Sequence, residues 1–168
     1  MTNIELRILS DKDVTQSYVD WFSNPLVTQF SDNRYRKFTL GGQIEYVKKI
    51  LKVSNQHLFG IFESKEHVGN IVLGPIDLNH RRAEITYVIG STNHWGKGIG
   101  TYAVREIVKK TKRDYDLIKV FAGCASHNEG SKKILLKNGF VLEGVRKKHL
   151  FFDGIWMDQL DYGLILGD

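Results

Sequence analysis

The hydrophobic positions along the chain change period several times, and each change marks an expected element. Alternating apolar and polar residues predict strands, and apolar residues three or four apart predict helices. The expected strands are residues 4–8, 57–62, 68–73, 83–89, 117–124, 141–152 and 155–166. The expected helices are residues 11–22, 43–53, 98–113 and 128–137. This order predicts an α+β fold, a single domain over residues 1–168 with a mixed, mostly antiparallel sheet flanked by helices.

Local signals set several of the expected ends. Ser10 is the expected N-cap of the first helix, and Pro25 is expected to end that helix. Asn128 is the expected N-cap of the last helix, and Gly139 its left-handed C-terminal residue. Asp153 followed by Gly154 predicts the tight turn of a C-terminal hairpin.

The chain is organised around residues 87–101. A strand-like run ends in a polar loop with glycines at positions 96, 98 and 100, and a helical period begins at once. Glycine lets the backbone approach a phosphate closely, and the N–H groups of a first helical turn lack helical partners. The helix dipole adds to their attraction for an anion. The stretch therefore predicts a phosphate-binding site.

Two well-known phosphate loops fit this stretch poorly. A P-loop needs a lysine followed by Ser or Thr after a fixed glycine spacing, and Lys97 is followed by Gly98. Residues 98–103 do match the dinucleotide pattern G-x-G-x-x-G/A. That fold needs an acidic residue at the end of the next strand, whereas residues 117–124 run into Gly-Cys-Ala. A dinucleotide therefore stays open only as a weak alternative.

Residues 95–100, Trp-Gly-Lys-Gly-Ile-Gly, resemble the acyl-CoA loop of the GNAT family of N-acetyltransferases. Trp95 takes the place of the leading Gln or Arg, as in the branch that resembles the ribosomal-protein acetyltransferases. Further matches follow in family order at residues 68–71, 82–87, 128–131, 138–140 and 143–146. Ordered agreement at separated points is much more specific than one glycine loop.

The resemblance implies a GNAT fold in which the strands at 83–89 and 117–124 splay apart around acetyl-CoA. The backbone of the first strand would pair with the pantetheine arm, and its N–H groups around residues 88–90 would polarise the thioester carbonyl. The amides of residues 95–101 would hold the pyrophosphate, and Asn128 and Ser131 would lie along the pantetheine. The expected cofactor residues are Val88, Ile89, Trp95, Gly96, Lys97, Gly98, Ile99, Gly100, Thr101, Asn128 and Ser131.

The resemblance also leaves one catalytic role open. Many family members carry a tyrosine general acid four residues before the Gly-Phe pair, and this chain has Leu135 there. Ser131 is the nearest substitute for protonating the leaving thiolate. Water or a tyrosine elsewhere, such as Tyr87, is the alternative.

Glu84 is the first candidate for the general base, because it lies on the strand that meets the thioester. The competing interpretation is structural, with Glu84 paired to Arg81 or Arg82 in the hairpin. His127 is the second candidate, since it follows the splayed strand and has a suitable intrinsic pKa. No pair of His or Cys residues has metal-ligand spacing, so we expect no metal.

Composition narrows the setting. The 168 residues are 42% hydrophobic and 26% charged, as in a soluble globular protein, and the start of the chain does not resemble a signal peptide. Cys124 is the single cysteine and is expected in the core. No apolar run could cross a membrane, and the expected location is cytoplasmic. The net charge of +5 suits a phosphate-bearing ligand, whereas aromatics are not interleaved with the basic runs as nucleic-acid binding would need.

The resulting hypothesis is direct transfer of an acetyl group from acetyl-CoA to a primary amine. Residues 68–76 resemble acetyltransferases that act on amino sugars of surface polysaccharides, some of them nucleotide-linked, and Arg34, Arg36 and Arg81 could meet such a phosphate. A protein N-terminal amine is the rival acceptor, and a non-catalytic CoA-binding domain the rival class. In the family, the stretch at 31–38 helps to form the acceptor pocket.

The sequence does not determine the oligomeric state. The tip of the C-terminal hairpin carries three aromatic residues that could join two copies as a homodimer. They are Phe151, Phe152 and Trp156.

Overall fold

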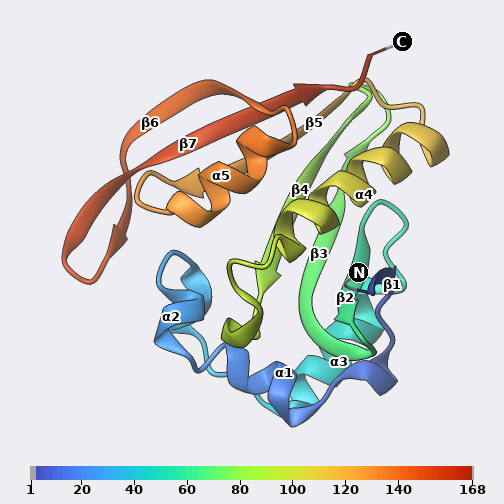
Figure 1. Ribbon diagram of the computed structural model, residues 1–168, viewed down its shortest axis with the longest axis vertical. Coiled ribbons are helices and arrows are strands. Elements are labelled where there is room, and N and C mark those ends of the chain that lie inside the picture. The colour runs from blue at the N-terminus through green and yellow to red at the C-terminus, as the bar shows by residue number, and fades with distance from the viewer. Residues whose placement is uncertain (1–2, 168) are drawn as a thin grey trace.

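The computed structural model describes residues 3–167, in which seven strands form one sheet (Figure 1). The strand order is β1-β2-β3-β4-β5-β7-β6, and only β4 and β5 pair in parallel. This confirms the predicted mixed, mostly antiparallel sheet. The strands are β1 (Ile4–Ile8), β2 (His57–Glu63), β3 (Glu66–Asp77), β4 (Arg82–Ile89), β5 (Lys119–Ala125), β6 (Val141–Phe152) and β7 (Ile155–Ile165).

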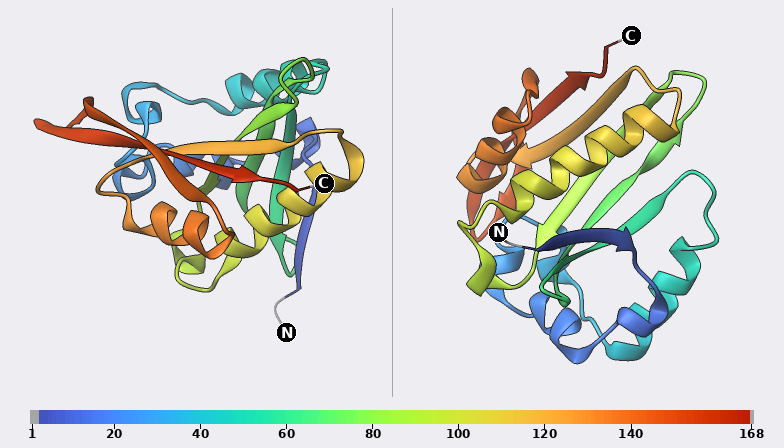
Figure 2. Two further views of the ribbon diagram at one scale, coloured as in Figure 1. Left: turned by 90° about the horizontal axis from the view of Figure 1, so that it is seen from above. Right: turned by 45° about the vertical axis from the view of Figure 1, so that its right-hand side comes forward.

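Helices cover both faces of the sheet. Helices α4 (Ile99–Asp114) and α5 (Glu129–Lys137) lie on one face, and the short N-terminal helices lie on the other (Figure 2). The latter are α1 (Gln16–Trp21), α2 (Pro25–Thr28) and α3 (Leu40–Ile50). Within residues 3–167 no helix is both long and apolar enough to cross a membrane.

The first predicted helix is wrong in its extent. Ser10 caps only a single 3-10 turn, Asp11–Asp13, and α1 starts later, where the Thr15 side chain accepts from the Tyr18 amide at 3.3 Å. Pro25 does not end a helix but opens α2, whose N-cap is Asn24. Proline is tolerated at the first helical position because the N–H that it lacks would have no helical partner there.

Two hydrophobic clusters hold the layers together. The larger lies between the sheet and α4, and it includes Cys124, as predicted, together with the fully buried Leu135. The smaller joins the sheet to α1 and α3 through residues such as Tyr18, Val47 and Leu58. The sheet is therefore packed on both faces, and its strands are correspondingly apolar.

Strands β4 and β5 part soon after they meet. Their pairing covers only residues 82–84 of β4 and 119–121 of β5, after which β5 continues alongside β7. The rest of β4 keeps β3 as its neighbour on one side, and no strand of the described residues 3–167 pairs with it on the other. This confirms the expected splay, and it leaves a gap in the middle of the sheet.

The β6–β7 hairpin turns at Asp153 and Gly154, both with positive φ, as predicted. Its tip packs against the 3-10 turn Asp32–Tyr35, where the Tyr35 hydroxyl donates to the Phe151 carbonyl at 2.9 Å. Phe152 is only 2% exposed, so it cannot contribute to a contact between copies as expected. Phe151 and Trp156 remain exposed, and a homodimer through them stays a prediction.

Candidate active site

One cleft of about 1000 Å³ passes through the gap between β4 and β5. On one side it is lined by the glycine loop and the first turns of α4 and α5, which we call the loop half. On the other side it is lined by α1, α2, α3, parts of the segment 29–38 and the facing side of β3 and β4, which we call the helical half. The cleft thus joins the two faces of the sheet at the one place where the sheet is open.

The glycine loop has the geometry of an anion site. Gly98 is the N-cap of α4 with φ of +79°, and Gly96 has φ of +75°, a region that glycine enters without strain. A Cβ on either residue would meet nothing within 4 Å, so the backbone is open to a ligand. Residues 98–101 line the cleft with the partnerless amides of the first helical turn. These features fit the pyrophosphate of acetyl-CoA, whereas Lys97 does not line the cleft.

The role expected for the Trp95 amide in holding the pyrophosphate is wrong. Its backbone N–H donates to the Thr92 carbonyl at 3.1 Å and is therefore not open to a phosphate. Its indole N–H donates to the Ile89 carbonyl at 2.8 Å, which ties the loop to the end of β4. Trp95 lines the cleft with its side chain rather than with a free amide.

The exposed edge of β4 offers fewer amides than expected. The Gly90 N–H donates to the Val68 carbonyl at 3.0 Å and so points toward β3. Because backbone groups alternate between the two edges of an antiparallel strand, Val88 shares that direction and Ile89 faces the gap. Of the three amides at residues 88–90, that of Ile89 is the one placed to meet a carbonyl oxygen.

Two hydroxyl groups meet beside the gap. The Asn128 side chain caps α5 by accepting from the Ser131 amide at 3.0 Å, as predicted. The Ser131 hydroxyl lies 2.7 Å from that of Tyr87, and both residues line the cleft. Burial raises the pKa of Tyr87, so the phenol keeps its proton at neutral pH. Leu135, in contrast, is fully buried and points into the core.

Glu84 is half-buried, and it does not form the ion pair with Arg81 or Arg82 that would give it a structural role. Arg81 pairs with Asp116, and Arg82 lies 3.8 Å from Asp77, so neither arginine takes the role of partner to Glu84. Burial raises the pKa of Glu84, although the nearby Arg146 guanidinium opposes this rise. Its side chain does not line the cleft.

The alternation of β4 nevertheless brings Glu84 close to the cleft. Glu84 lies on the same face of the strand as Thr86, which does line it. The two Cα atoms are about 7 Å apart at the rise of an extended strand. Glu84 therefore lies on the face of β4 that borders the helical half, next to the lining of the cleft. His127, the second base candidate, is exposed and does line the cleft.

The helical half contains polar residues to which the sequence analysis gave no role in the site. Gln43 is 6% exposed and Asn70 is 5% exposed, and both line the cleft. A signal existed for each: Gln43 lies one helical turn before the core residue Val47, and Asn70 interrupts an apolar strand. A polar residue on an otherwise apolar face is informative, because burying its amide is costly without a partner.

A second overlooked cluster fixes the turn before the glycine loop. The His94 ring lies 2.9 Å from the Glu63 carboxylate and 2.7 Å from the Ser91 hydroxyl. The His94 and Glu63 side chains are only 12% and 11% exposed. The cluster therefore holds the turn Thr92–His94 against the end of β2.

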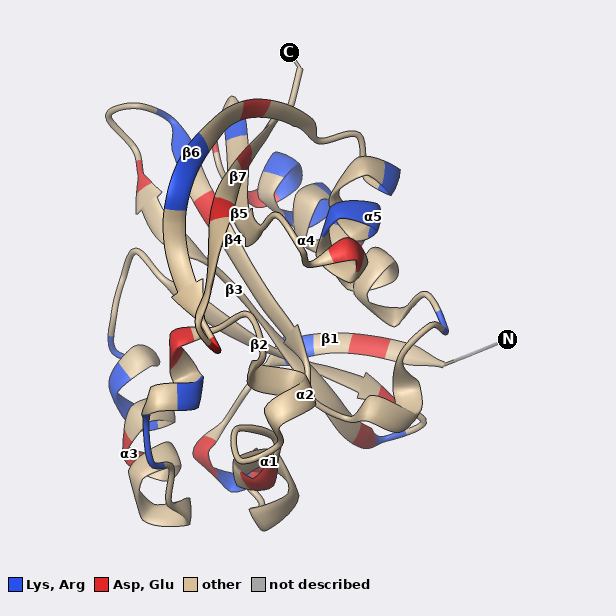
Figure 3. Ribbon diagram, turned by 90° about the vertical axis from the view of Figure 1, so that its left-hand side faces the viewer, with Lys and Arg blue, Asp and Glu red and all other residues tan. Residues whose placement is uncertain are grey.

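Basic side chains border the cleft, but fewer than expected. Lys133 and Lys137 of α5 and Arg36 line it, and Figure 3 shows α5 as a basic element. Arg34 is engaged instead, donating to Asp153 at 2.5 Å and to the Gln29 carbonyl at 3.1 Å. Arg81 is held by Asp116 and does not line the cleft. Of the three arginines expected to meet a phosphate, only Arg36 is placed for it.

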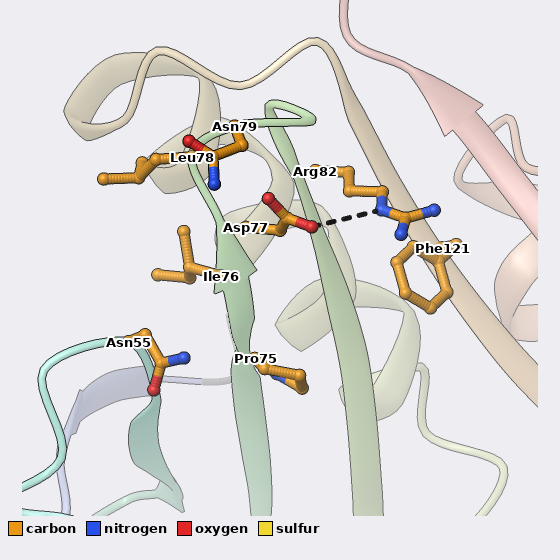
Figure 4. A pocket seen from close by; sticks show the side chains of 8 residues that line it. All are labelled: Asn55, Pro75, Ile76, Asp77, Leu78, Asn79, Arg82 and Phe121. Atoms are coloured by element: carbon orange, nitrogen blue, oxygen red, sulfur yellow. Dashed lines mark ion pairs between the residues drawn. The ribbon is translucent and has the colours of Figure 1, made fainter.

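A separate cavity of about 540 Å³ lies near the end of β3 (Figure 4). It is lined by residues such as Pro75, Asp77 and Phe121, and it contains the ion pair between Asp77 and Arg82. It has neither a glycine loop nor a helix N-terminus. We therefore place the candidate site in the larger cleft.

Comparison with known proteins identifies the family. A family model described as acetyltransferase (GNAT) domain matches residues 3–141. A probable N-acetyltransferase of Bacillus subtilis is 34% identical over 129 residues, which cover 73% of this chain and 70% of that protein. The ribosomal-protein-serine acetyltransferase of Escherichia coli is 29% identical over 109 residues, covering 65% and 60%.

A solved structure shares the fold over almost its whole length. It is the spermidine N-acetyltransferase from Vibrio cholerae in complex with CoA and spermine. The TM-score is 0.85 at 20% identity, and the match covers 97% of this chain and 95% of that one. The predicted fold and the resemblance to the ribosomal-protein branch are thus confirmed.

Proposed function

Since the chain belongs to the GNAT family and is an acetyl-CoA-dependent N-acetyltransferase, we propose that it acetylates the primary amine of an amino sugar. The observation that carries this proposal is the continuous cleft through the splayed strands. Its loop half suits a pyrophosphate, and its helical half suits a small polar acceptor. The location in the cytoplasm stays a prediction.

Acetyl-CoA, when bound, supplies a thioester whose C–S bond breaks as the amine forms its C–N bond. The chain's own groups would do three things at the gap. The Ile89 N–H would stabilise the negative charge that develops on the carbonyl oxygen. The Tyr87 and Ser131 hydroxyls, 2.7 Å apart, would pass a proton to the departing sulfur. Glu84 would accept a proton from the amine through one water.

The shape of the helical half supports a small acceptor rather than a protein. Ser31, Asn33 and Arg36 line the cleft, while the intervening Arg34 and Tyr35 bind the hairpin tip. The segment is therefore held by the hairpin tip and forms one side of the helical half. An amino sugar, with or without a nucleotide, suits such a polar and weakly basic pocket.

The protein N-terminal amine is kept as the second candidate because of one observation. The Escherichia coli relative carries the name ribosomal-protein-serine acetyltransferase. A non-catalytic CoA-binding domain is the third, and the hydroxyl pair of Tyr87 and Ser131 argues against it by filling the role that Leu135 cannot.

The decisive experiment measures thiol release from acetyl-CoA with a set of separate amines. The set is glucosamine, a UDP-linked amino sugar, spermidine and a peptide with an N-terminal serine. Turnover led by an amino sugar would support the proposal, and turnover led by the peptide would replace it with the second candidate. Binding of acetyl-CoA without turnover of any amine would indicate a non-catalytic domain.

Glu84→Gln tests the base. We expect kcat/KM to fall at least 10-fold at neutral pH, because the amine loses its proton acceptor. In the wild type, activity should fall as the pH drops through the raised pKa of Glu84, and the variant should lose that limb of the profile.

The same substitution has a consequence for stability. A raised folded-state pKa means that folding favours the protonated carboxyl, so ionised Glu84 costs stability. The variant should therefore melt no lower than the wild type at pH 8, and an unchanged pH profile would exclude Glu84 as the base.

A further inference from the structure

The helical half of the cleft has a sheet floor and a helical roof. On the floor, Asn70 of β3 lies opposite Val88 of β4, and Val72 lies opposite Thr86. All four side chains line the cleft. The roof comes from α1, α2 and α3, so an acceptor that reaches the gap must pass between these two surfaces.

Gln43 of α3 presents a free amide to this space. The residue is 6% exposed and lies on the inner face of the helix, one turn before the core residue Val47. Its side chain makes no hydrogen bond to any residue in the range 3–167, yet its amide atoms are not sealed from the cleft. An amide that is nearly buried and lacks a protein partner is well placed to bind a hydrogen-bonding ligand.

Asn70 presents a second amide, in a fixed orientation. Its Oδ1 lies 2.8 Å from Nε2 of His67, and because an amide oxygen only accepts, this ring nitrogen carries the hydrogen. The Asn70 NH2 group is therefore directed away from His67. Burial raises the pKa of the Tyr18 phenol, and a hydrogen bond with Asn70 opposes this rise. The donor group thus lies at the cleft beside Tyr18.

The charges that line the cleft disfavour a polycationic acceptor in this half. Glu129 is the one carboxylate among the described residues that line the cleft, and it lies at the start of α5, where Lys132 is 2.5 Å away. The helical half is bordered by Arg36 instead. A polyamine would favour carboxylates here, whereas hydroxyl groups suit the unpaired amide of Gln43 and the NH2 group of Asn70.

We propose that the side-chain amides of Gln43 and Asn70 bind hydroxyl groups of the acceptor beside its reacting amine. These two residues, with His67 positioning Asn70, would select a polyhydroxylated amine over a polyamine. The inference rests on the proposed N-acetyltransferase function and adds the residues that determine its specificity.

Gln43→Glu tests the inference by adding a negative charge at constant shape. Thiol release from acetyl-CoA is measured with glucosamine, a UDP-linked amino sugar and spermidine. We expect kcat/KM for the better amino sugar to fall about 10-fold or more and kcat/KM for spermidine to rise at least 5-fold. Gln56→Glu is the matched control, since Gln56 does not line the cleft and the same change there should alter neither value.

A second variant tests the inference if Gln43→Glu folds poorly. Gln43→Met keeps the volume without polar groups, and it should lower amino-sugar turnover about 10-fold without any gain for spermidine. Calorimetric binding of acetyl-CoA should stay within twofold in both variants. An unchanged ranking of the amines would overturn the inference alone. Absence of turnover with every amine, despite acetyl-CoA binding, would overturn the proposed function and this inference with it.

Discussion

The two halves of the cleft present different chemistry to their ligands. The loop half offers backbone: the open glycines at 96 and 98, the first turn of α4 and the free edge of β4. The helical half offers side chains: Gln43, Asn70 and Arg36, brought from α3, β3 and the segment before α3. Apart from the first turn of α5, the loop half is continuous in sequence, whereas the helical half is assembled from distant segments.

This difference separates what a family shares from what one member selects. Backbone amides bind any pyrophosphate of the right shape, so the loop half can serve every acyl-CoA enzyme of the fold. Side-chain amides and charges can change one at a time without loss of the fold. Substitutions in the loop half should therefore affect cofactor binding for every acceptor, and those in the helical half should change the choice of acceptor.

Gly98→Asp should have the largest effect. The carboxylate would stand in open space at the N-terminus of α4, where it would repel the pyrophosphate. We expect acetyl-CoA affinity to fall about 100-fold in a calorimetric titration. Gly154→Asp is the matched control, because Gly154 has a similar φ of +77° and equally open surroundings in the hairpin turn. Equal acetyl-CoA affinity of the Gly98 variant and the wild type would show that the pyrophosphate does not bind at this loop.

Tyr87→Phe tests the hydroxyl pair that lies beside the gap where the two halves of the cleft meet. The change removes one hydroxyl of the pair that lies beside the gap. We expect kcat to fall about 30-fold with every amine, because the departing sulfur loses its proton donor. Ser131→Ala should cost about 10-fold, and acetyl-CoA binding should change less than 3-fold in either variant. A fall confined to one acceptor would instead assign Tyr87 to acceptor selection.

Arg36→Gln should have the smallest effect. Arg36 is exposed at the border of the helical half, where solvent screens its charge. We expect KM for a UDP-linked amino sugar to rise about 5-fold, with little change for glucosamine, in a steady-state assay. Arg81→Gln should leave both KM values unchanged, because Asp116 holds that side chain outside the cleft. Equal losses with both amines would mean that Arg36 does not meet a phosphate.

The sequence by itself determined most of the fold and the loop half of the cleft. The hydrophobic periods predicted all seven strands. Residue type also predicted three local conformations, which are the helix cap at Asn128, the positive φ of Gly139 and the turn at residues 153–154. These features depend on neighbours in the chain, which is why they can be predicted from local pattern. The extent predicted for the first helix was wrong because Ser10 can cap a 3-10 turn as well as an α-helix, and Pro25 can begin a helix as well as end one.

Only the tertiary structure decided the helical half and the partners of the charged residues. Arg34 and Asp153 are far apart in sequence, as are Arg81 and Asp116, and folding turned two expected phosphate ligands into structural contacts. Gln43 and Asn70 became site residues because packing placed both nearly buried amides at the cleft, where Gln43 has no hydrogen-bond partner among residues 3–167 and Asn70 is oriented by His67. Local sequence carries no information on which distant groups will share a buried space, and that space is where acceptor choice is made.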